Sequence, residues 1–246
     1  MGVEVITNAK VYLGGYNLSG DENQVSLAMS TDLVDDTAMG SEFRSRVCGL
    51  RGMTLDLNGF FQVDDDDYQV DDVLNSKFGV ADEICTVCPT TGAEGEPAFA
   101  FKGIAGQYSP GAALGELLKF SAQLQSSNAL PIIRGTVLVN GTKSTTANGT
   151  AFNLGAVGAG QYLYAVMHVV APTGTLPTLD MLVQSDAAEG FDTPATKITF
   201  SQVTTSAGAQ WATRVAGPIT DAWWRASWTI GGTLPSYPVI VMAAIQ

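Results

Sequence analysis

Apolar and polar residues alternate along much of this chain, and the clearest run is 54–60 (TLDLNGF), where leucines recur at every second position. A period of two places successive side chains on opposite faces of a β-strand. The run therefore predicts a strand with one buried face and one solvent-exposed face. Such a strand needs neighbours, so the pattern predicts an all-β fold in which the remaining segments supply the other strands.

Apolar runs bounded by Gly, Pro, Ser and Asn predict those other strands. We expect them at 3–18, with a bend at Gly14-Gly15, and at 25–29, 98–108, 114–125, 132–139, 162–170, 179–184, 197–203, 223–230 and 239–245. Ser109-Pro110-Gly111 predicts a turn between two of them. Residues 73–78 differ, because their apolar spacing predicts one or two helical turns with Asp71 and Asp72 at the amino end.

The segment before the clearest strand carries several turn signals. Asp35-Asp36-Thr37 predicts an acidic turn, 40–46 a link of small and charged residues, and 49–52 (GLRG) a hinge. We expect long loops at 32–46 and at 64–72, and the second of these is strongly acidic.

Composition changes at 140–149 (NGTKSTTANG), which is polar, small and without an apolar anchor. Such a stretch is typical of a linker between domains. We therefore expect a first β-sandwich domain at 1–140 with an acidic loop and a short helix, a linker at 141–149, and a second β-sandwich domain at 150–246.

The two halves share short segments in the same order. Residues 54–57 resemble 178–181, and 117–121 resemble 223–227; 99–102 can also be laid against 198–201, and 131–133 against 238–240. An internal duplication explains this order. Because β-strands in general share the same alternation of apolar and polar residues, a chance arrangement explains this order too, and both interpretations stay open.

The chain has 12 basic and 24 acidic residues, a net charge of −12. This charge balance argues against a protein that binds nucleic acid by neutralising its phosphates. It fits an acidic surface that keeps the protein soluble, and also a surface past which DNA moves without adhering. No apolar run reaches the roughly 18 residues of a membrane span, and the amino terminus has no signal-peptide pattern, so we expect no membrane association.

The residues offer little for catalysis or metal binding. Cys85 and Cys88 have the spacing of a redox or zinc motif, but a structural zinc site needs four ligands and the single histidine, His168, lies far away in an apolar run. We interpret the cysteines as inert and His168 as a strand residue with satisfied hydrogen bonds. The aspartates of 64–72 lack the spacing of a calcium loop. No Gly-x-Ser-x-Gly or phosphate-binding loop is present. We therefore expect no enzyme activity, no cofactor and no metal.

Three tryptophans near the carboxyl end favour two different functions. Trp223, Trp224 and Trp228 are suited to stacking on sugars, which would make the chain a carbohydrate-binding or capsid-decorating β-sandwich module. In an alternating strand, however, Trp224 and Trp228 share one face and Trp223 lies on the other. That placement favours packing in a core or an interface.

The arrangement of the first 140 residues resembles the major tail tube proteins of long-tailed bacteriophages. The resemblance lies in the acidic turn at 35–37, the link at 44–49, the strand ending at 57–60, the short helix after an aspartate loop, and the segment from Phe120-Ser121 to Arg134-Gly135. The last 100 residues are similar to β-sandwich segments of phage virion proteins. A second β region is a departure from the single-domain members of the family.

The resemblance implies a structural virion protein with no catalytic role. Copies of the chain would form closed rings that stack into a tail tube, assembled in the host cytoplasm with other tail proteins, and DNA would pass through the lumen without specific binding. If the duplication is real, three chains supply six similar sandwiches; this trimer with pseudo-sixfold symmetry is preferred over a hexamer. Contacts between subunits or rings are expected at the loop residues Asp35, Asp36, Thr37, Phe43, Arg44, Arg46, Asp64, Asp65, Asp66 and Asp67.

Overall fold

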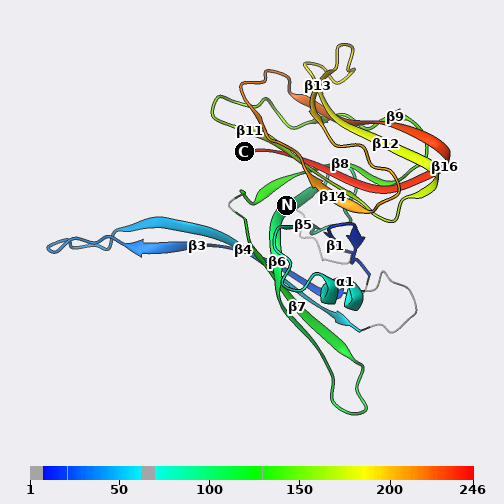
Figure 1. Cartoon of the computed structure of the whole chain (residues 1–246). Coiled ribbons are helices and arrows are strands. Elements are labelled where there is room, and N and C mark those ends of the chain that lie inside the picture. Colours follow the sequence, from blue (N-terminus) through cyan, green and yellow to red (C-terminus); the bar gives the residue numbers. More distant parts are fainter. Residues whose placement is uncertain (1–7, 21, 62–69, 129) are drawn as a thin grey trace. The chain divides into compact units, whose positions relative to one another are not determined.

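The computed structural model describes residues 8–20, 22–61, 70–128 and 130–246, and it confirms an all-β chain with one short helix (Figure 1). The elements are β1 (Lys10–Leu13), β2 (Tyr16–Asn17), β3 (Glu22–Asp35), β4 (Arg46–Phe60), α1 (Val70–Ser76), β5 (Glu83–Cys88), β6 (Pro97–Gly111), β7 (Lys119–Ser126), β8 (Ile133–Lys143), β9 (Ala147–Asn148), β10 (Phe152–Asn153), β11 (Tyr162–Val169), β12 (Thr173–Asp186), β13 (Ala195–Thr199), β14 (Gly208–Trp211), β15 (Val215–Ala216) and β16 (Trp223–Ile245).

Contacts group these elements into two compact units. Unit 1 contains the described residues up to 20 together with 83–101 and 133–246, and unit 2 contains those of 22–82 and 102–132. This grouping differs from the linear division expected from the sequence. Residues 141–149 lie in unit 1, where the end of β8 and all of β9 pair with β16. Pairing between strands that are distant in the sequence therefore decides the units, and the polar composition of one stretch does not.

Unit 1 is organised around β16. The sequence predicts two strands separated by a turn at Gly231-Gly232, but β16 is one continuous strand of 23 residues. Its first half pairs with β12 and its second half with β11 and β8. Because both halves are held by neighbours, the glycines and proline between them bend the strand without ending it.

The tryptophans fill the core of unit 1. Trp224 is fully buried and Trp228 nearly so, whereas Trp223 is half-buried. The indole N–H of Trp224 donates to the Gly155 carbonyl at 2.9 Å, and that of Trp228 donates to the Thr145 carbonyl at 2.9 Å. Both large side chains are thus buried with their polar atoms satisfied. The packing interpretation of the tryptophans is confirmed.

His168 joins the amino-terminal strands to β11. Its Nδ1 lies 2.8 Å from the Gly14 carbonyl oxygen and its Nε2 lies 2.8 Å from Thr86 Oγ1. A neutral ring satisfies both contacts, with Nδ1–H donating to the carbonyl and Nε2 accepting from the hydroxyl. Burial lowers the pKa of His168 to about 4. The prediction of a satisfied strand histidine is confirmed.

The cysteines of β5 are buried in the same region. Cys85 and Cys88 are both reduced and inaccessible to solvent. Burial raises the pKa of the Cys88 thiol to about 12, so the thiolate that redox chemistry and metal binding require is disfavoured.

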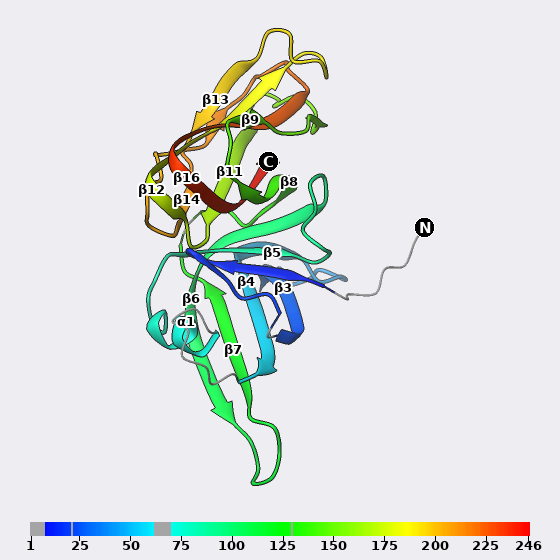
Figure 2. The ribbon, with the colours of Figure 1, turned by 90° about the vertical axis from the view of Figure 1, so that its right-hand side faces the viewer.

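Unit 2 contains an antiparallel sheet in the order β3-β4-β7-β6 (Figure 2). The leucines at 55, 57 and 124 point to its buried face, as the alternation predicts. α1 buries Val70, Val73 and Leu74, and the Tyr108 hydroxyl donates a hydrogen bond to Asp71 in its first turn. The expected helix therefore exists, shifted by a few residues.

The hairpin between β6 and β7 differs from the prediction at its tip. Pro110 pairs with Phe120 and Gly111 with Lys119, so the expected turn at 109–111 is part of β6. The connection lies at 112–118, and Leu114 is fully exposed there. Continued pairing with β7 outweighs the local turn chemistry of Pro and Gly.

Two strand pairs, one in each unit, have corresponding registers. Aligning 54–57 with 178–181 and 117–121 with 223–227 places Leu55 on Leu179 and Leu124 on Ile230. Leu55 lies opposite Leu124 in the β4–β7 pair, and Leu179 lies opposite Ile230 in the β12–β16 pair. The strands beside these pairs differ, because β6 lies next to β7 whereas β13 lies next to β12. The correspondence therefore covers one antiparallel strand pair in each unit, and it does not extend to the neighbouring strands.

Candidate functional site

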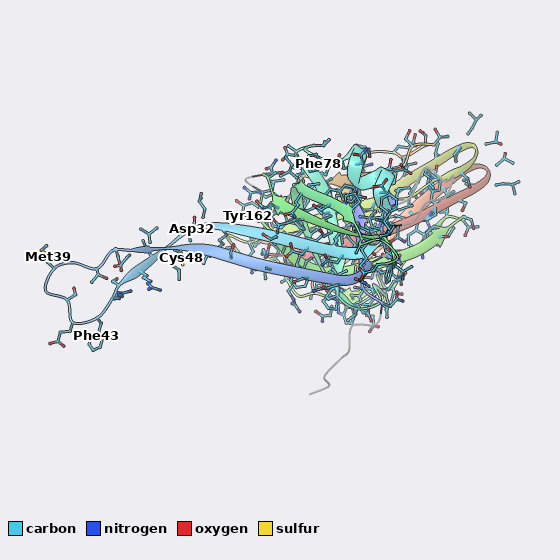
Figure 3. All side chains as sticks on the ribbon, turned by 90° about the horizontal axis from the view of Figure 1, so that it is seen from below. Asp32, Met39, Phe43, Cys48, Phe78 and Tyr162 are labelled. Carbon is cyan, nitrogen blue, oxygen red and sulfur yellow. The ribbon has the colours of Figure 1, made fainter. Side chains whose placement is uncertain are left out.

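A long β-hairpin arm is the main surface feature of unit 2. β4 pairs with β7 only over 54–60. β3 and β4 pair with each other beyond this region, as far as Asp35 and Arg46. Residues 30–52 therefore form a two-stranded arm that leaves the sheet (Figure 1 and Figure 3). The sequence predicts a loop and a hinge over most of this range, so its strand character was missed.

A β-bulge divides the arm. Thr31 pairs with Arg51 and Leu33 pairs with Cys48, so two residues of β4 lie opposite Asp32. A Cβ on Gly49 would lie only 2.9 Å from the Asp32 Cβ, which explains a glycine at this position. The expected hinge at 49–52 is thus a bulge that bends a continuous strand.

The tip of the arm is fixed by its acidic turn. The Thr37 backbone N–H donates to Asp35 Oδ1 at 3.0 Å, and the Ser45 N–H donates to Thr37 Oγ1 at 2.9 Å. The Asp36 N–H donates to the Ser45 carbonyl at 3.2 Å. Hydrogen bonds from the Thr37 hydroxyl and backbone hold the pKa of Asp35 below its usual value. These bonds close the base of the tip and present 38–44 to solvent.

The arm exposes apolar side chains that the other described residues do not cover. Met39 and Phe43 at the tip are 106% and 84% exposed. Both are labelled at the far end of the arm in Figure 3. Further along the arm, Leu33, Val34, Val47 and Leu50 are also exposed. A concentration of exposed apolar side chains on one projecting element is typical of an interaction site.

The structure brings together most of the contact residues expected from the sequence. Asp35, Asp36, Thr37, Phe43, Arg44 and Arg46 all lie at the end of the arm, and all are exposed. Asp64, Asp65, Asp66 and Asp67 lie outside the described residues. The arm carries both acidic and basic groups, so its polar contacts can involve either sign of charge.

A second feature is the solvent-exposed face of the unit 2 sheet. It contains a shallow hollow of about 300 Å³, lined by Gln24, Ser26, Asp56, Asn58, Gln107, Ser121, Ala122 and Gln123. Among these eight residues only Asp56 is charged. Gln123 Nε2 donates to Asp56 Oδ1 at 2.8 Å, and Gln125 Nε2 donates to Gln123 Oε1 at 2.8 Å. The face is therefore rich in amides and hydroxyls. In the sequence, the polar residues at alternate positions of 54–58 and 121–125 indicate this composition.

Within the described ranges, no group of three or more His, Cys, Asp or Glu side chains is placed to hold a metal ion. The described chain also has no helix of the length and apolar character needed to cross a bilayer. Unit 2 thus offers two candidate surfaces, the arm and the amide-rich face.

No protein-family model and no curated protein matches this chain. Among solved structures, it is similar to a chain of the virion of a native gene transfer agent particle, with 12% identity and a TM-score of 0.44 over 53% of this chain and 98% of that one. It is also similar to the SPP1 Dit protein, with 12% identity and a TM-score of 0.40 over 97% and 99%. A chain of the phage p2 baseplate matches with 10% identity and a TM-score of 0.32 over 96% and 97%. TM-scores below 0.5 do not define a shared fold, so the functions of those proteins do not transfer to this chain.

Proposed function

We propose that this chain is a structural protein of a bacteriophage tail, where copies of it form rings that stack into a hollow tube for passage of the genome. The observation that carries the proposal is the arm. Its strands project from the sheet with their apolar side chains uncovered, so within the described part of a single chain the arm has no packing partner.

Burial of the arm would stabilise an assembly. Covering an exposed leucine or phenylalanine side chain contributes about 1.5–3 kcal/mol, and the arm and its tip expose several such side chains. Part of this gain offsets the loss of freedom when subunits associate. A second copy of the chain fits as the partner because identical subunits close into rings when the rotation between neighbours allows it.

The outer edge of β3 also favours assembly. Among the described strands, β3 pairs only with β4. A long strand that has a neighbouring strand on one side alone is a template for pairing with another chain. In a closed ring, pairing with the neighbouring subunit would remove this edge and join the sheets of successive subunits.

The amide-rich face suits the wall of a conduit for DNA. It presents neutral amide and hydroxyl groups with Asp56 among them, on a chain whose net charge is −12. Such a surface offers no cluster of cations to bind phosphates, so a polyanion passes it without strong adhesion. We assign this face to the lumen.

The corresponding registers of β4–β7 and β12–β16 support an internal duplication of this strand pair. With one such pair in each unit, three chains would place six related strand pairs around a ring. We therefore propose a trimer with pseudo-sixfold symmetry in preference to a hexamer.

The alternative, a carbohydrate-binding module, was motivated by three tryptophans near the carboxyl end. Trp224 and Trp228 are buried in the core of unit 1 and are not available to stack on a sugar. We therefore retain the tail protein as the proposed function.

The arm supplies the test. We expect the double substitution Met39→Ser and Phe43→Ser to weaken self-assembly of the full chain, measured by sedimentation velocity over a range of concentrations. The matched control is Ser41→Ala, which changes the same tip without removing apolar surface. Assembly of the double variant at wild-type concentrations would contradict the assigned role of the arm.

A further inference from the structure

A repeated tetrapeptide forms an unusual corner in unit 1. Gly-Thr-Leu-Pro occurs at 174–177, in β12, and again at 232–235, in β16. The two copies run antiparallel, with Thr175 opposite Thr233. They are thus related by an approximate local two-fold axis, at the point where β16 bends from one set of partners to the other (Figure 1). We call these eight residues the twin-leucine corner.

The glycines of the twin-leucine corner are explained by its geometry. A Cβ on Gly232 would lie 2.6 Å from the Leu176 carbonyl oxygen, and a Cβ on Gly174 would lie 2.9 Å from the Pro235 Cα. Each copy therefore needs its glycine so that the other copy can cross it closely. Both glycines also have positive φ, of 130° at Gly174 and 101° at Gly232.

The leucines are not explained by folding. Leu176 and Leu234 each have φ of 49°, in the left-handed region that favours Gly or Asn and strains other side chains. They are also 85% and 87% exposed, so neither contributes its apolar surface to the core. Strain and exposure thus coincide at both symmetry-related positions. Backbone strain of this kind is typical of sites that are kept for a function.

We propose that the twin-leucine corner is a docking surface for a second copy of this chain. Two copies with a net charge of −12 repel each other, and contact is easiest where charge is absent. Residues 173–178 and 231–236 contain no charged side chain. The corner therefore offers apolar surface at a place where like charges do not meet.

The size of the corner also favours a second copy over a separate partner. Two leucine side chains and their neighbours cover much less than the ~1,000 Å² that a stable complex between two proteins buries. A contact this small becomes effective when it is repeated many times in one assembly. The inference thus rests on the self-assembly described under the proposed function, and it adds unit 1 to the surfaces that take part.

Asparagine substitutions separate docking from folding. Asn tolerates positive φ better than Leu, so Leu176→Asn with Leu234→Asn removes the apolar surface while relieving backbone strain. We expect the thermal stability of the full chain to be maintained or raised. Its self-association constant, measured by sedimentation equilibrium, should fall by at least about tenfold. The matched control, Leu176→Met with Leu234→Met, keeps the apolar surface and should associate within about twofold of the wild type.

Wild-type association by the asparagine variant would overturn the inference, and so would a wild-type chain that stays monomeric at every concentration. Electron microscopy distinguishes this failure from failure of the proposed function. Normal rings from the asparagine variant would support the proposed tube and contradict the docking role of the corner. Wild-type association that depends on the leucines but forms no rings would support the corner and contradict the tube.

Discussion

His168 provides a quantitative test of the unit 1 fold. Its ring is completely buried and neutral, held between the Gly14 carbonyl and the Thr86 hydroxyl. Its pKa is about 4 in the folded chain, compared with 6.5 for an ordinary histidine. The unfolded chain therefore binds a proton more readily than the folded chain between these values, and stability must fall as the pH falls.

The size of the effect follows from the two pKa values. A difference of one pKa unit corresponds to about 1.4 kcal/mol, so lowering the pH from above 6.5 to near 4 should remove about 3 kcal/mol of unfolding free energy through His168 alone. This contribution is fully present above pH 6.5. Carboxylates also titrate toward the lower end of this range, so a variant without the histidine is needed for comparison.

We therefore compare the wild type with His168→Gln by urea unfolding at a series of pH values from 7.5 to about 4. All four tryptophans lie between 211 and 228, in unit 1, so their fluorescence follows unfolding of the unit that holds His168. The variant is expected to be less stable at pH 7.5, and the gap should shrink by about 3 kcal/mol at low pH. Equal losses of stability in the two proteins would refute the reasoning, as would a pKa of 6 or above for His168 measured by NMR.

Two further predictions concern packing and the conduit. A Cβ on Gly135 would lie 2.1 Å from the Ala243 carbonyl oxygen, so Gly135→Ala should lower the free energy of unfolding by more than about 2 kcal/mol, measured by urea unfolding. The control Gly106→Ala, with open space around the glycine, should change that free energy by less than about 1 kcal/mol. Similar effects at both sites would contradict the packing described for β8 and β16. In virions, Asp56→Lys with Gln123→Lys should slow genome release in an ejection assay because both positions face the proposed lumen, and unchanged kinetics would count against that assignment.

The sequence predicts well those elements whose side chains alternate between core and solvent. Residues 54–60 form a strand with the expected buried face, and Trp224 packs in a core because its neighbours in β16 alternate in the same way. The helix near Asp71 is also found, because its apolar spacing and its acidic first turn are local signals.

Features that depend on distant partners were not predictable in this way. The arm is a paired hairpin, yet both faces of its strands are exposed, so no alternation marks them in the sequence. The two units are also assembled from separated segments, which local composition does not reveal. Among the local signals, the repeated Gly-Thr-Leu-Pro was readable from the sequence, but without the pairing of β12 and β16 it indicates only turns.

The central claim is that the chain assembles with itself into rings. Negative-stain electron microscopy of the purified full chain at high concentration tests it most directly, with analytical ultracentrifugation of dilute samples alongside. We predict rings or hollow tubes, with threefold symmetry and a pseudo-sixfold appearance in the averaged end views. Isolated monomers at every concentration, with neither rings nor tubes, would contradict the account.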